Sequence, residues 1–422
     1  MRFRTYQEEI IDQGSEILKE KGILYLAMEV RTGKTLTSLG ICERIEARTV
    51  LFITKKNAIG DIQSDALMLN PQFRINIINY ESLHKVDQLP MRESEKTLKI
   101  DTIICDEAHS MGAFPKPSKR AKQVKDLLKK HNANLILMSG TPTPESFSQM
   151  YHQVYGHPSN PFSQYRNFYA WAKDYVDVRQ RKIHGNYIND YSRGIEATIL
   201  GAVEPFTISF TQKEAGFKST IQEEVRHVKM DIQTYQLCKK LRKDSVIDGK
   251  SETILADTGA KMMSKLHQIY SGTVIFESGK AQVLDWNKAD YIAKEFYDQK
   301  IAIFYKFKAE LQALKDVYPS TRLTTDLEDF RSDPKKSIAL QIVSGREGIS
   351  LKEAKHIVYF NIDFSATSYW QSRDRMTTQF RPENKVYWIF SEDGIEDKIY
   401  KVVNEKKNYT LKYFREDMGK LF

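Results

Sequence analysis

The sequence predicts an α/β fold with two tandem lobes, each a mostly parallel sheet with helices on both faces. Apolar, strand-like runs alternate with helix-like runs over about residues 1–140, and the alternation returns over about residues 300–420. Such alternation is typical of parallel sheets, because parallel neighbours are joined by helical crossovers. The length of 422 residues is also sufficient for two or three separate cores.

Short runs rich in aliphatic and β-branched residues mark the strands of the first lobe. In chain order these are Ile23–Ala27, Thr49–Thr54, Arg74–Asn79, Thr102–Cys105 and Leu135–Ser139. A helix is expected over Leu36–Ala47, directly after the first strand and its loop.

The second lobe repeats this pattern. Its strands are expected at Ile301–Tyr305, Ser337–Val343, His356–Asn361 and Val386–Ser391, and its helices at Lys308–Val317, at Ala366–Gln379 and from Glu396 onward. We therefore divide the chain into an N-terminal lobe over residues 1–222 and a C-terminal lobe over residues 223–422.

Residues 145–222 interrupt the regular alternation and are interpreted as an insertion in the N-terminal lobe. Their aromatic side chains recur every three or four residues, which favours a helix that buries one face, with stacking of nucleic-acid bases as the alternative. The aromatic residues concerned are Phe162, Tyr165, Phe168, Trp171 and Tyr175. The tract Arg179–Arg193 is expected to be an exposed loop that could contact DNA.

The composition is ordinary for a soluble globular protein, with 41% hydrophobic and 28% charged residues. No apolar run is long enough to cross a bilayer and the N-terminus lacks the apolar core of a secretion signal, so we expect a cytoplasmic protein without membrane contacts. Cys42, Cys105 and Cys238 are far apart and argue against a disulfide frame or a zinc site. The net charge of +9 suits either a polyanionic partner or a merely basic surface.

Gly33, Lys34 and Thr35 close a phosphate-binding turn between the first strand and its helix. Backbone amides at the helix start would face the phosphates, Lys34 would bring a positive charge to them, and Thr35 would bind Mg²⁺. Arg31 and Thr32 of the same loop complete the predicted ATP contacts.

The run Asp106-Glu107-Ala108-His109 supports this interpretation, because it ends another apolar strand. The carboxyl ends of parallel strands share one edge of a sheet, where ligands bind. Asp106 is expected to bind Mg²⁺ through its water shell, and Glu107 to orient and deprotonate the attacking water. The two motifs together predict a site that binds and hydrolyses ATP.

In the order of these motifs, and over nearly its whole length, the chain resembles the helicase superfamily 2 ATPases. It is most similar to Swi/Snf-type translocases and their compact bacteriophage relatives. The resemblance implies two RecA-like lobes and a Gln7 amide that reads the adenine edge. It also implies that Lys55 and Lys56 contact nucleic acid, and that Ser139 and Thr141 couple phosphate loss to that contact.

In the second lobe, Ile301–Phe307 resembles the strand that opens this lobe in the family, and Ser344–Leu351 resembles its Gly-rich turn. The resemblance implies that Ser344 and Gly345 grip nucleic acid and that Gly348 borders the nucleotide.

Gln371 and Arg375 have the spacing of the family's arginine-finger helix. The resemblance therefore assigns Gln371 to the nucleotide site and Arg375 to the transferring phosphate, where a planar, permanently charged guanidinium suits phosphate oxygens. Thr378 stands where the family has a second arginine, and Arg373 or Arg381 would then supply that charge.

Three other charged or polar segments can be interpreted either as ordinary surface structure or as functional contacts. Lys55–Asn57 suits a solvated loop as well as a phosphate contact, and Ser139–Pro142 taken alone is typical of a turn. Lys122, Lys125 and Lys129 share one face of an expected helix, which favours a solvated surface over phosphate contact.

The leading functional hypothesis is a DNA-dependent ATPase that translocates on duplex or branched DNA in replication or recombination. The DNA preference comes from the family resemblance and not from the charge. The alternatives are an RNA helicase, an ATP-gated nucleic-acid-binding or loader module, and the motor of a restriction enzyme. A bacteriophage origin would place the protein in the cytoplasm of a bacterial host.

Overall fold

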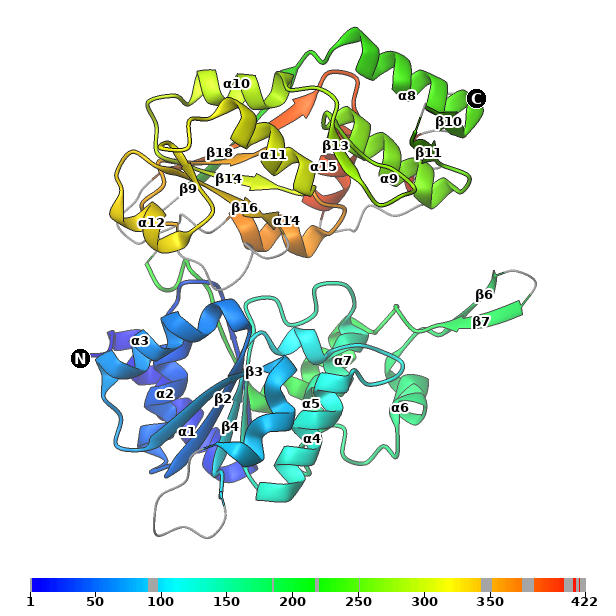
Figure 1. Cartoon of the computed structure of the whole chain (residues 1–422). Coiled ribbons are helices and arrows are strands. Elements are labelled where there is room, and N and C mark those ends of the chain that lie inside the picture. Colours follow the sequence, from blue (N-terminus) through cyan, green and yellow to red (C-terminus); the bar gives the residue numbers. More distant parts are fainter. Residues whose placement is uncertain are drawn as a thin grey trace. The chain divides into compact units, whose positions relative to one another are not determined.

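The computed structural model describes residues 2–89, 98–183, 186–216, 220–249, 251–342, 351–373, 383–405, 413–414 and 417. The chain divides into two compact units, Met1–Phe217 and Lys218–Phe422. Each unit contains a six-stranded sheet whose strand pairings are all parallel. The predicted α/β fold with two tandem parallel-sheet lobes is therefore confirmed (Figure 1).

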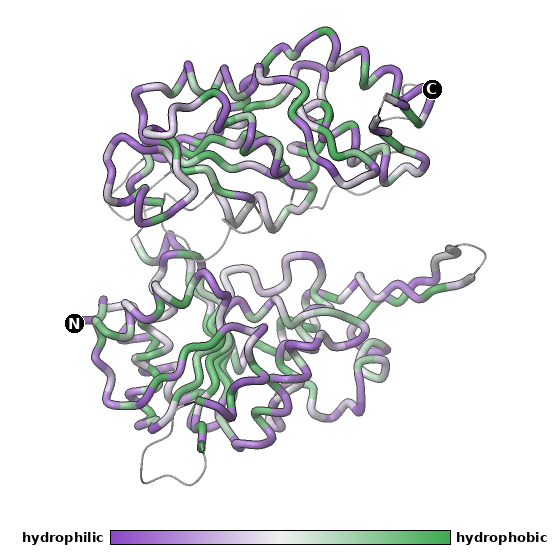
Figure 2. The backbone as a smooth tube through the Cα atoms, viewed as in Figure 1, coloured by the Kyte–Doolittle hydropathy of each residue, from purple (hydrophilic) through white to green (hydrophobic). Residues whose placement is uncertain are grey.

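The sheet of the first unit has the strand order β3-β2-β4-β5-β1-β8. Its strands are β1 (Ile23–Met28), β2 (Thr49–Thr54), β3 (Arg74–Asn79), β4 (Thr102–Cys105), β5 (Asn134–Met138) and β8 (Thr207–Phe210). β2, β3 and β4 have the predicted bounds, and β1 and β5 differ from theirs by one residue at one or both ends. Figure 2 shows these strands as hydrophobic, in keeping with a sheet that is buried on both faces.

Helices cover both faces of this first sheet. On one face, α1 (Thr5–Lys21), α2 (Lys34–Arg44) and α3 (Ile59–Leu69) share a core with alternate strand residues such as Leu26 and Phe52. On the other face, α4 (Lys119–His131) and α5 (Met150–Val154) pack against the residues between them in the strands. Three 3₁₀ helices, η1 (Lys56–Ala58), η2 (Tyr80–Gln88) and η3 (Ala108–Met111), follow β2, β3 and β4.

The segment interpreted as an insertion contributes to the sheet itself. β8 lies inside residues 145–222 and pairs in parallel with β1, from Tyr25 opposite Thr207 to Met28 opposite Phe210. An edge strand is chosen by its long-range partner, and four residues carry too weak a local pattern to reveal it. The interpretation of residues 145–222 as a pure insertion therefore needs this correction.

The aromatic residues of this segment form a core, as the sequence favoured. Phe162, Phe168 and Trp171 are buried, and Tyr165 and Tyr175 pack against them. The helix is shorter than their spacing suggests, because α6 spans only Phe168–Tyr175.

The expected loop at Arg179–Arg193 is instead largely a β-hairpin. β6 (Arg179–Ile183) and β7 (Asn186–Asp190) form an antiparallel pair and join no other described strand. Figure 1 shows this hairpin extending away from the sheet of its unit. The chain then continues through α7 (Glu196–Val203) to β8.

The sheet of the second unit has the order β15-β16-β14-β17-β18-β9. Its strands are β9 (Thr220–Val228), β14 (Ile301–Tyr305), β15 (Leu323–Thr324), β16 (Ser337–Gln341), β17 (His356–Tyr359) and β18 (Glu383–Ser391). β14 has its predicted bounds, and β17 ends two residues before Asn361. β9, at the predicted lobe boundary, is the edge strand beside β18.

The helices of the second unit pack on its sheet in two cores. They are α8 (Ile232–Asp244), α9 (Gly259–Tyr270), α10 (Asn287–Glu295), α11 (Lys308–Val317), α12 (Leu327–Ser332), α14 (Ala366–Arg373) and α15 (Glu396–Asn404). Short hairpins β10–β11 (Val246–Asp248, Thr253–Leu255) and β12–β13 (Thr273–Ile275, Ala281–Val283) lie between them in the chain. α11 has its predicted bounds. The end of the helix expected at Ala366–Gln379 lies outside the described residues.

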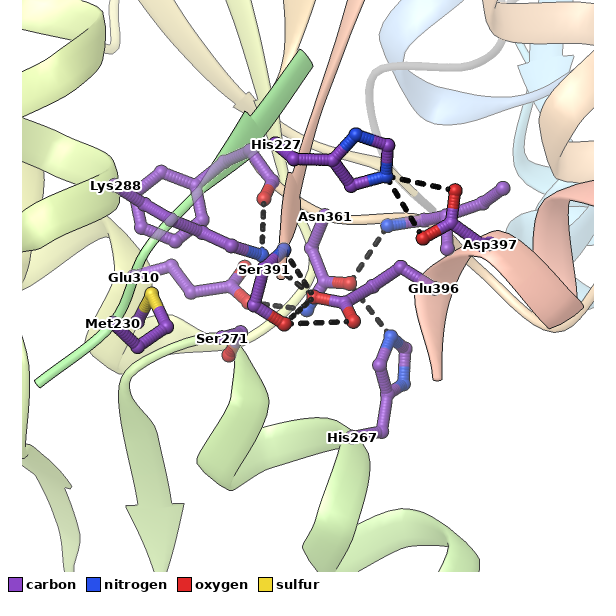
Figure 3. Close-up of polar contacts among 12 residues, drawn as sticks. His227, Met230, His267, Ser271, Lys288, Glu310, Asn361, Ser391, Glu396 and Asp397 are labelled. Atoms are coloured by element: carbon purple, nitrogen blue, oxygen red, sulfur yellow. Dashed lines mark hydrogen bonds and ion pairs between the residues drawn. The ribbon is translucent and has the colours of Figure 1, made fainter. Parts of the chain in front are cut away.

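A buried ion pair lies inside the second unit (Figure 3). Lys288 Nζ lies 2.7 Å from Glu396 Oε1, and both side chains are fully buried. Ser391 Oγ also donates to Glu396. A Cβ on Gly394 would lie 2.0 Å from Glu396 Oε2, so this turn accommodates the carboxylate only with glycine there.

A second buried polar chain lies beside this pair (Figure 3). Asn361 Nδ2 donates to Glu310 Oε1 at 2.6 Å, and Asn361 Oδ1 lies 2.6 Å from His267 Nε2. Burial lowers the pKa of His267 well below its usual value, and the Lys306 ammonium acts in the same direction. The neutral imidazole can then donate its Nε2 proton to Asn361, which fixes the amide orientation.

None of the described helices is both long and apolar enough to cross a membrane. The three cysteines are free thiols in the cores of the two units.

Candidate nucleotide-binding site

The loop between β1 and α2 has the backbone shape of a phosphate cradle. Gly33 precedes α2 with φ 83°, a left-handed conformation that favours glycine, and no side chain caps the helix start. The first amides of α2 are thus presented to a ligand at the positive end of the helix dipole. A Cβ on Gly33 would lie 2.5 Å from Gln7 Nε2, so a larger residue would strain the backbone and also displace the Gln7 amide.

Some side chains of the loop stabilise its backbone, and others are positioned to contact a ligand. Lys34 Nζ donates to the carbonyls of Met28 at 2.9 Å and Glu29 at 3.1 Å, which holds the ammonium over the loop. Thr32 is buried and its hydroxyl donates to the Glu29 carbonyl at 2.7 Å. The Thr35 hydroxyl makes no hydrogen bond to any described residue, and its side chain is partly exposed at the start of α2. The cradle, the ammonium and this hydroxyl fit a triphosphate with Mg²⁺.

Gln7 supports the loop from α1. It is buried, its Nε2 lies 3.4 Å from the Gly33 carbonyl and 3.3 Å from Thr37 Oγ1, and its Oε1 accepts the Arg4 amide proton. Its neighbour Tyr6 donates to the Thr32 carbonyl at 3.1 Å. The structure thus places Gln7 beneath the phosphate loop, and an adenine contact by its amide stays a prediction.

The strand β8 and the turn after it hold the other side of the loop. Gln212 donates its backbone N–H to Glu29 Oε2 at 2.7 Å and its side-chain amide to the Val30 carbonyl at 2.9 Å. The Phe210 ring stacks on Tyr6 with centroids 4.7 Å apart. No local pattern in the sequence indicates this support, because the partner lies 182 or 183 positions away in the chain.

Asp106 directly follows β4, at the same sheet edge as the phosphate loop. Its Oδ2 accepts the Thr54 hydroxyl proton at 2.8 Å, and its backbone carbonyl accepts that of Tyr80 at 2.7 Å. Burial, followed by the neighbouring Glu107 charge, raises the pKa of Asp106 to about 6, while Thr54 and the Lys34 ammonium counteract this rise. A carboxylate that is costly to ionise would be stabilised by a bound divalent cation.

Glu107 is held in an unusual backbone conformation. It has φ 49°, in the left-handed region, and occupies the N-cap position of η3 without a side-chain hydrogen bond to that helix. Its side chain is 18% exposed, and Glu107 Oε2 lies 3.3 Å from His109 Nδ1. A left-handed backbone conformation is costly for a residue other than glycine, and such conformations are often found at functional sites. The conformation of Glu107 therefore supports a functional role for its side chain.

The segment predicted to couple the site to nucleic acid lies against His109 and the phosphate loop. Ser139 Oγ is 3.0 Å from His109 Nδ1 and accepts the Thr141 amide proton at 3.1 Å. A Cβ on Gly140 would lie 3.6 Å from Lys34 Nζ. His109 therefore links Glu107 to Ser139, a connection that the sequence motif contained but did not reveal.

Lys55 and Lys56 follow β2, next to Thr54 and hence at the same sheet edge. Lys55 is half-buried, and Lys56 is exposed at the start of η1. The structure places both lysines at this edge of the sheet, and their contact with nucleic acid stays a prediction.

The predicted site residues of the second lobe cannot be placed in the same way. Ser344, Gly345, Gly348 and Arg375 lie outside the described residues. Gln371 lies in α14, and its side chain is outside the description.

Comparison with known proteins gives a family. The model of the SNF2-related domain matches residues 25–272, which is more than half of the chain. No curated protein matches the sequence. A Sulfolobus solfataricus SWI2/SNF2 ATPase core, solved in complex with dsDNA, aligns with 14% identity and a TM-score of 0.43, covering 100% of this chain and 93% of that one. The matched span includes the phosphate loop, both carboxylates and the Ser139 segment, and on this ground the chain belongs to the SNF2-related family.

Proposed function

We propose that this protein is a DNA-dependent ATPase that moves on duplex or branched DNA. Family membership supports ATP hydrolase activity, with ATP and Mg²⁺ as the bound species. The observation that carries the proposal is the convergence of Lys34, Asp106 and Glu107 at one edge of a parallel sheet, with His109 connecting them to Ser139. This arrangement joins the chemistry of phosphoryl transfer to a segment that can respond to it.

The chain's own residues divide the work as follows. The α2 amides and Lys34 bind the phosphates, and Thr35 with Asp106 would hold Mg²⁺, which neutralises developing charge on the phosphate oxygens. Glu107 orients the attacking water and accepts its proton. His109 keeps Glu107 near its position through the 3.3 Å contact.

Arg375 is the proposed arginine finger, and it follows α14 in the sequence. Asp363 Oδ1 lies 2.6 Å from Lys306 Nζ, and its Oδ2 accepts the Ser368 hydroxyl proton at 2.8 Å. Burial would raise the pKa of Asp363, but the Lys306 ammonium and the Ser368 hydroxyl hold it below its usual value. An ion pair therefore ties the segment before α14 to the residue that follows β14.

Movement would follow from hydrolysis if Lys55 and Lys56 in one lobe and Ser344 and Gly345 in the other grip the phosphate backbone. Contacts to phosphates rather than bases suit a motor that passes over any sequence. Each round of ATP binding and release would then change the relation of the two grips.

The test is ATP turnover measured with single-stranded, duplex and forked DNA and with the matching RNAs. The proposal expects slow turnover alone and strong stimulation by duplex or forked DNA. Equal stimulation by RNA with none by duplex DNA would establish the RNA helicase instead. ATP-dependent binding without turnover on every nucleic acid would establish the loader module.

A further inference from the structure

A basic, aromatic pocket lies on the α4 side of the first unit, apart from the phosphate loop. It has a volume of about 380 Å³ and is lined by the segment before α4 and the first half of α4, by α5 and the residues after it, and by the start of α6. Its charged walls come from Lys116, Lys122, Lys125 and Arg166, and none of the described residues that line it is acidic. The volume is within the range of small-ligand sites.

The cations of this pocket differ from two neighbouring cations on the same helix, Arg120 and Lys130. On α4, Arg120 forms an ion pair with Glu81 of η2, and Lys130 forms one with Asp87. By contrast, Lys122 and Lys125 are exposed and have no ion-pair partner among the described residues. Unpaired cations gathered around one hollow create a local positive potential, which attracts an anion.

The aromatic side chains give the pocket a flat apolar wall. Tyr169 lines the pocket and is 47% exposed. Tyr155 lies deeper, stacked on Tyr151 at 4.7 Å and covered by Lys125, whose Nζ is 4.7 Å from the ring centroid. Tyr169 meets Phe168 and Tyr191 in edge-to-face contacts and is the exposed aromatic side chain of the pocket, while Lys125 lies over Tyr155.

We propose that this pocket binds an unpaired nucleotide of a nucleic-acid strand. The phosphate would contact Lys122, Lys125 and Arg166, and the base would stack on Tyr169. A nucleotide carries a flat base next to a phosphate, so its base can stack on an aromatic wall while its phosphate contacts a neighbouring cationic wall. A base in an intact duplex is already stacked on its neighbours, so the pocket selects single-stranded segments such as those at a branch. The inference rests on the proposed function and adds to it a third contact, outside the two predicted grips.

The test compares two pairs of charge removals on one helix, with the full chain and without ATP. Lys122→Gln with Lys125→Gln alters the pocket, and Lys119→Gln with Lys129→Gln removes the same charge from exposed α4 positions that do not line it. Binding of a fluorescent single-stranded oligonucleotide is measured over a range of salt concentrations. We expect the pocket pair to lower the salt slope by about 1 and to weaken binding several-fold more than the control pair. Equal losses in the two pairs would overturn the inference.

A second variant tests the stacking role. Tyr169→Ala should weaken single-strand binding by about fivefold to a hundredfold, with little effect on a blunt duplex. Tyr297→Ala, which removes a similarly exposed tyrosine from the second unit, is the matched control. Equal loss on single strand and duplex would contradict the selection of unpaired bases.

Binding of the free mononucleotide dTMP tests whether the pocket takes a free nucleotide or a nucleotide within a strand. If dTMP binds as tightly as the oligonucleotide and is lost with the pocket pair, the site takes free nucleotides and the strand assignment is wrong. DNA-stimulated turnover by the unaltered protein reports on the proposed function, and the paired lysine comparison reports on the pocket, so either can fail alone.

Discussion

Replacing Asp106 with asparagine should stabilise the protein in the absence of ligands, although it removes a predicted metal contact. The amide keeps the shape of the carboxylate and can still accept the Thr54 hydroxyl proton. Burial, together with the neighbouring Glu107 charge, raises the pKa of Asp106 from 3.8 to about 6. The substitution removes the free-energy cost of ionising this carboxyl group in the folded protein. A difference of about 2 pKa units corresponds to about 3 kcal/mol, an upper value here because Asp106 keeps some exposure.

The pH dependence fixes the sign of this effect. Because the folded protein holds the Asp106 proton more tightly than the unfolded chain does, the cost is absent below pH 3.8. It grows as the pH rises toward about 6 and is complete above that value. Asp106→Asn should therefore exceed the parent protein in stability by up to about 3 kcal/mol near pH 8, and by roughly half as much near pH 5.

Chemical unfolding in metal-free buffer at these two pH values is the measurement. Asp126→Asn, an exposed acid on α4 of the same unit, is the control for a general change of charge. Adding Mg²⁺ with a non-hydrolysable ATP analogue should stabilise the parent protein more than Asp106→Asn. A variant that is less stable than its parent near pH 8, or a difference that does not change with pH, would refute the reasoning.

Four further substitutions test the site and the second unit. Glu107→Gln should keep ATP binding and lose turnover by at least about 100-fold, and normal turnover would remove Glu107 from its role. Arg375→Ala should slow single-turnover hydrolysis by about 10³–10⁵ with a small change in ATP affinity, and a full-speed variant would move the finger to another arginine. Lys306→Met should slow the same step by up to about 100-fold with unchanged ATP affinity, because it releases the start of α14; a change in affinity alone would contradict the positioning role. Lys288→Met should cost about 3–5 kcal/mol in chemical unfolding, and adding Glu396→Gln should recover much of the loss, whereas a harmless single variant would show that the pair is not buried.

The sequence predicted those parts of the site that depend on local pattern. A buried strand, a glycine-containing turn and a helix follow one another in the chain, so Lys34 and Thr35 could be placed from that order alone. The strand before Asp106 likewise needed only a short apolar run. Because both strands are parallel, their ends had to share an edge, and the structure brings Lys34 and Asp106 within electrostatic influence of each other.

The contacts that depend on distant partners could not be predicted in this way. β8 and Gln212 reach the phosphate loop from a segment whose local pattern suggested an insertion. Lys288 and Glu396 are 108 positions apart, and each would be placed on the surface by its charge alone. The positions of such residues depend on partners that are distant in the sequence, and the periodicity of the sequence does not identify those partners.

The two buried acids Glu396 and Asp106 differ in a way that bears on function. Glu396 has the Lys288 ammonium at 2.7 Å and the Ser391 hydroxyl, so its charge is neutralised within the fold. Asp106 has the Thr54 hydroxyl, and the Lys34 ammonium that influences it is hydrogen-bonded to two loop carbonyls instead. A buried acid with its own cation has little to gain from another, whereas one without such a partner gains from any cation that reaches it. A metal-bound nucleotide would therefore relieve the free-energy cost of ionising Asp106. Part of its binding energy would arise at the edge of the sheet that carries Asp106 and the phosphate loop.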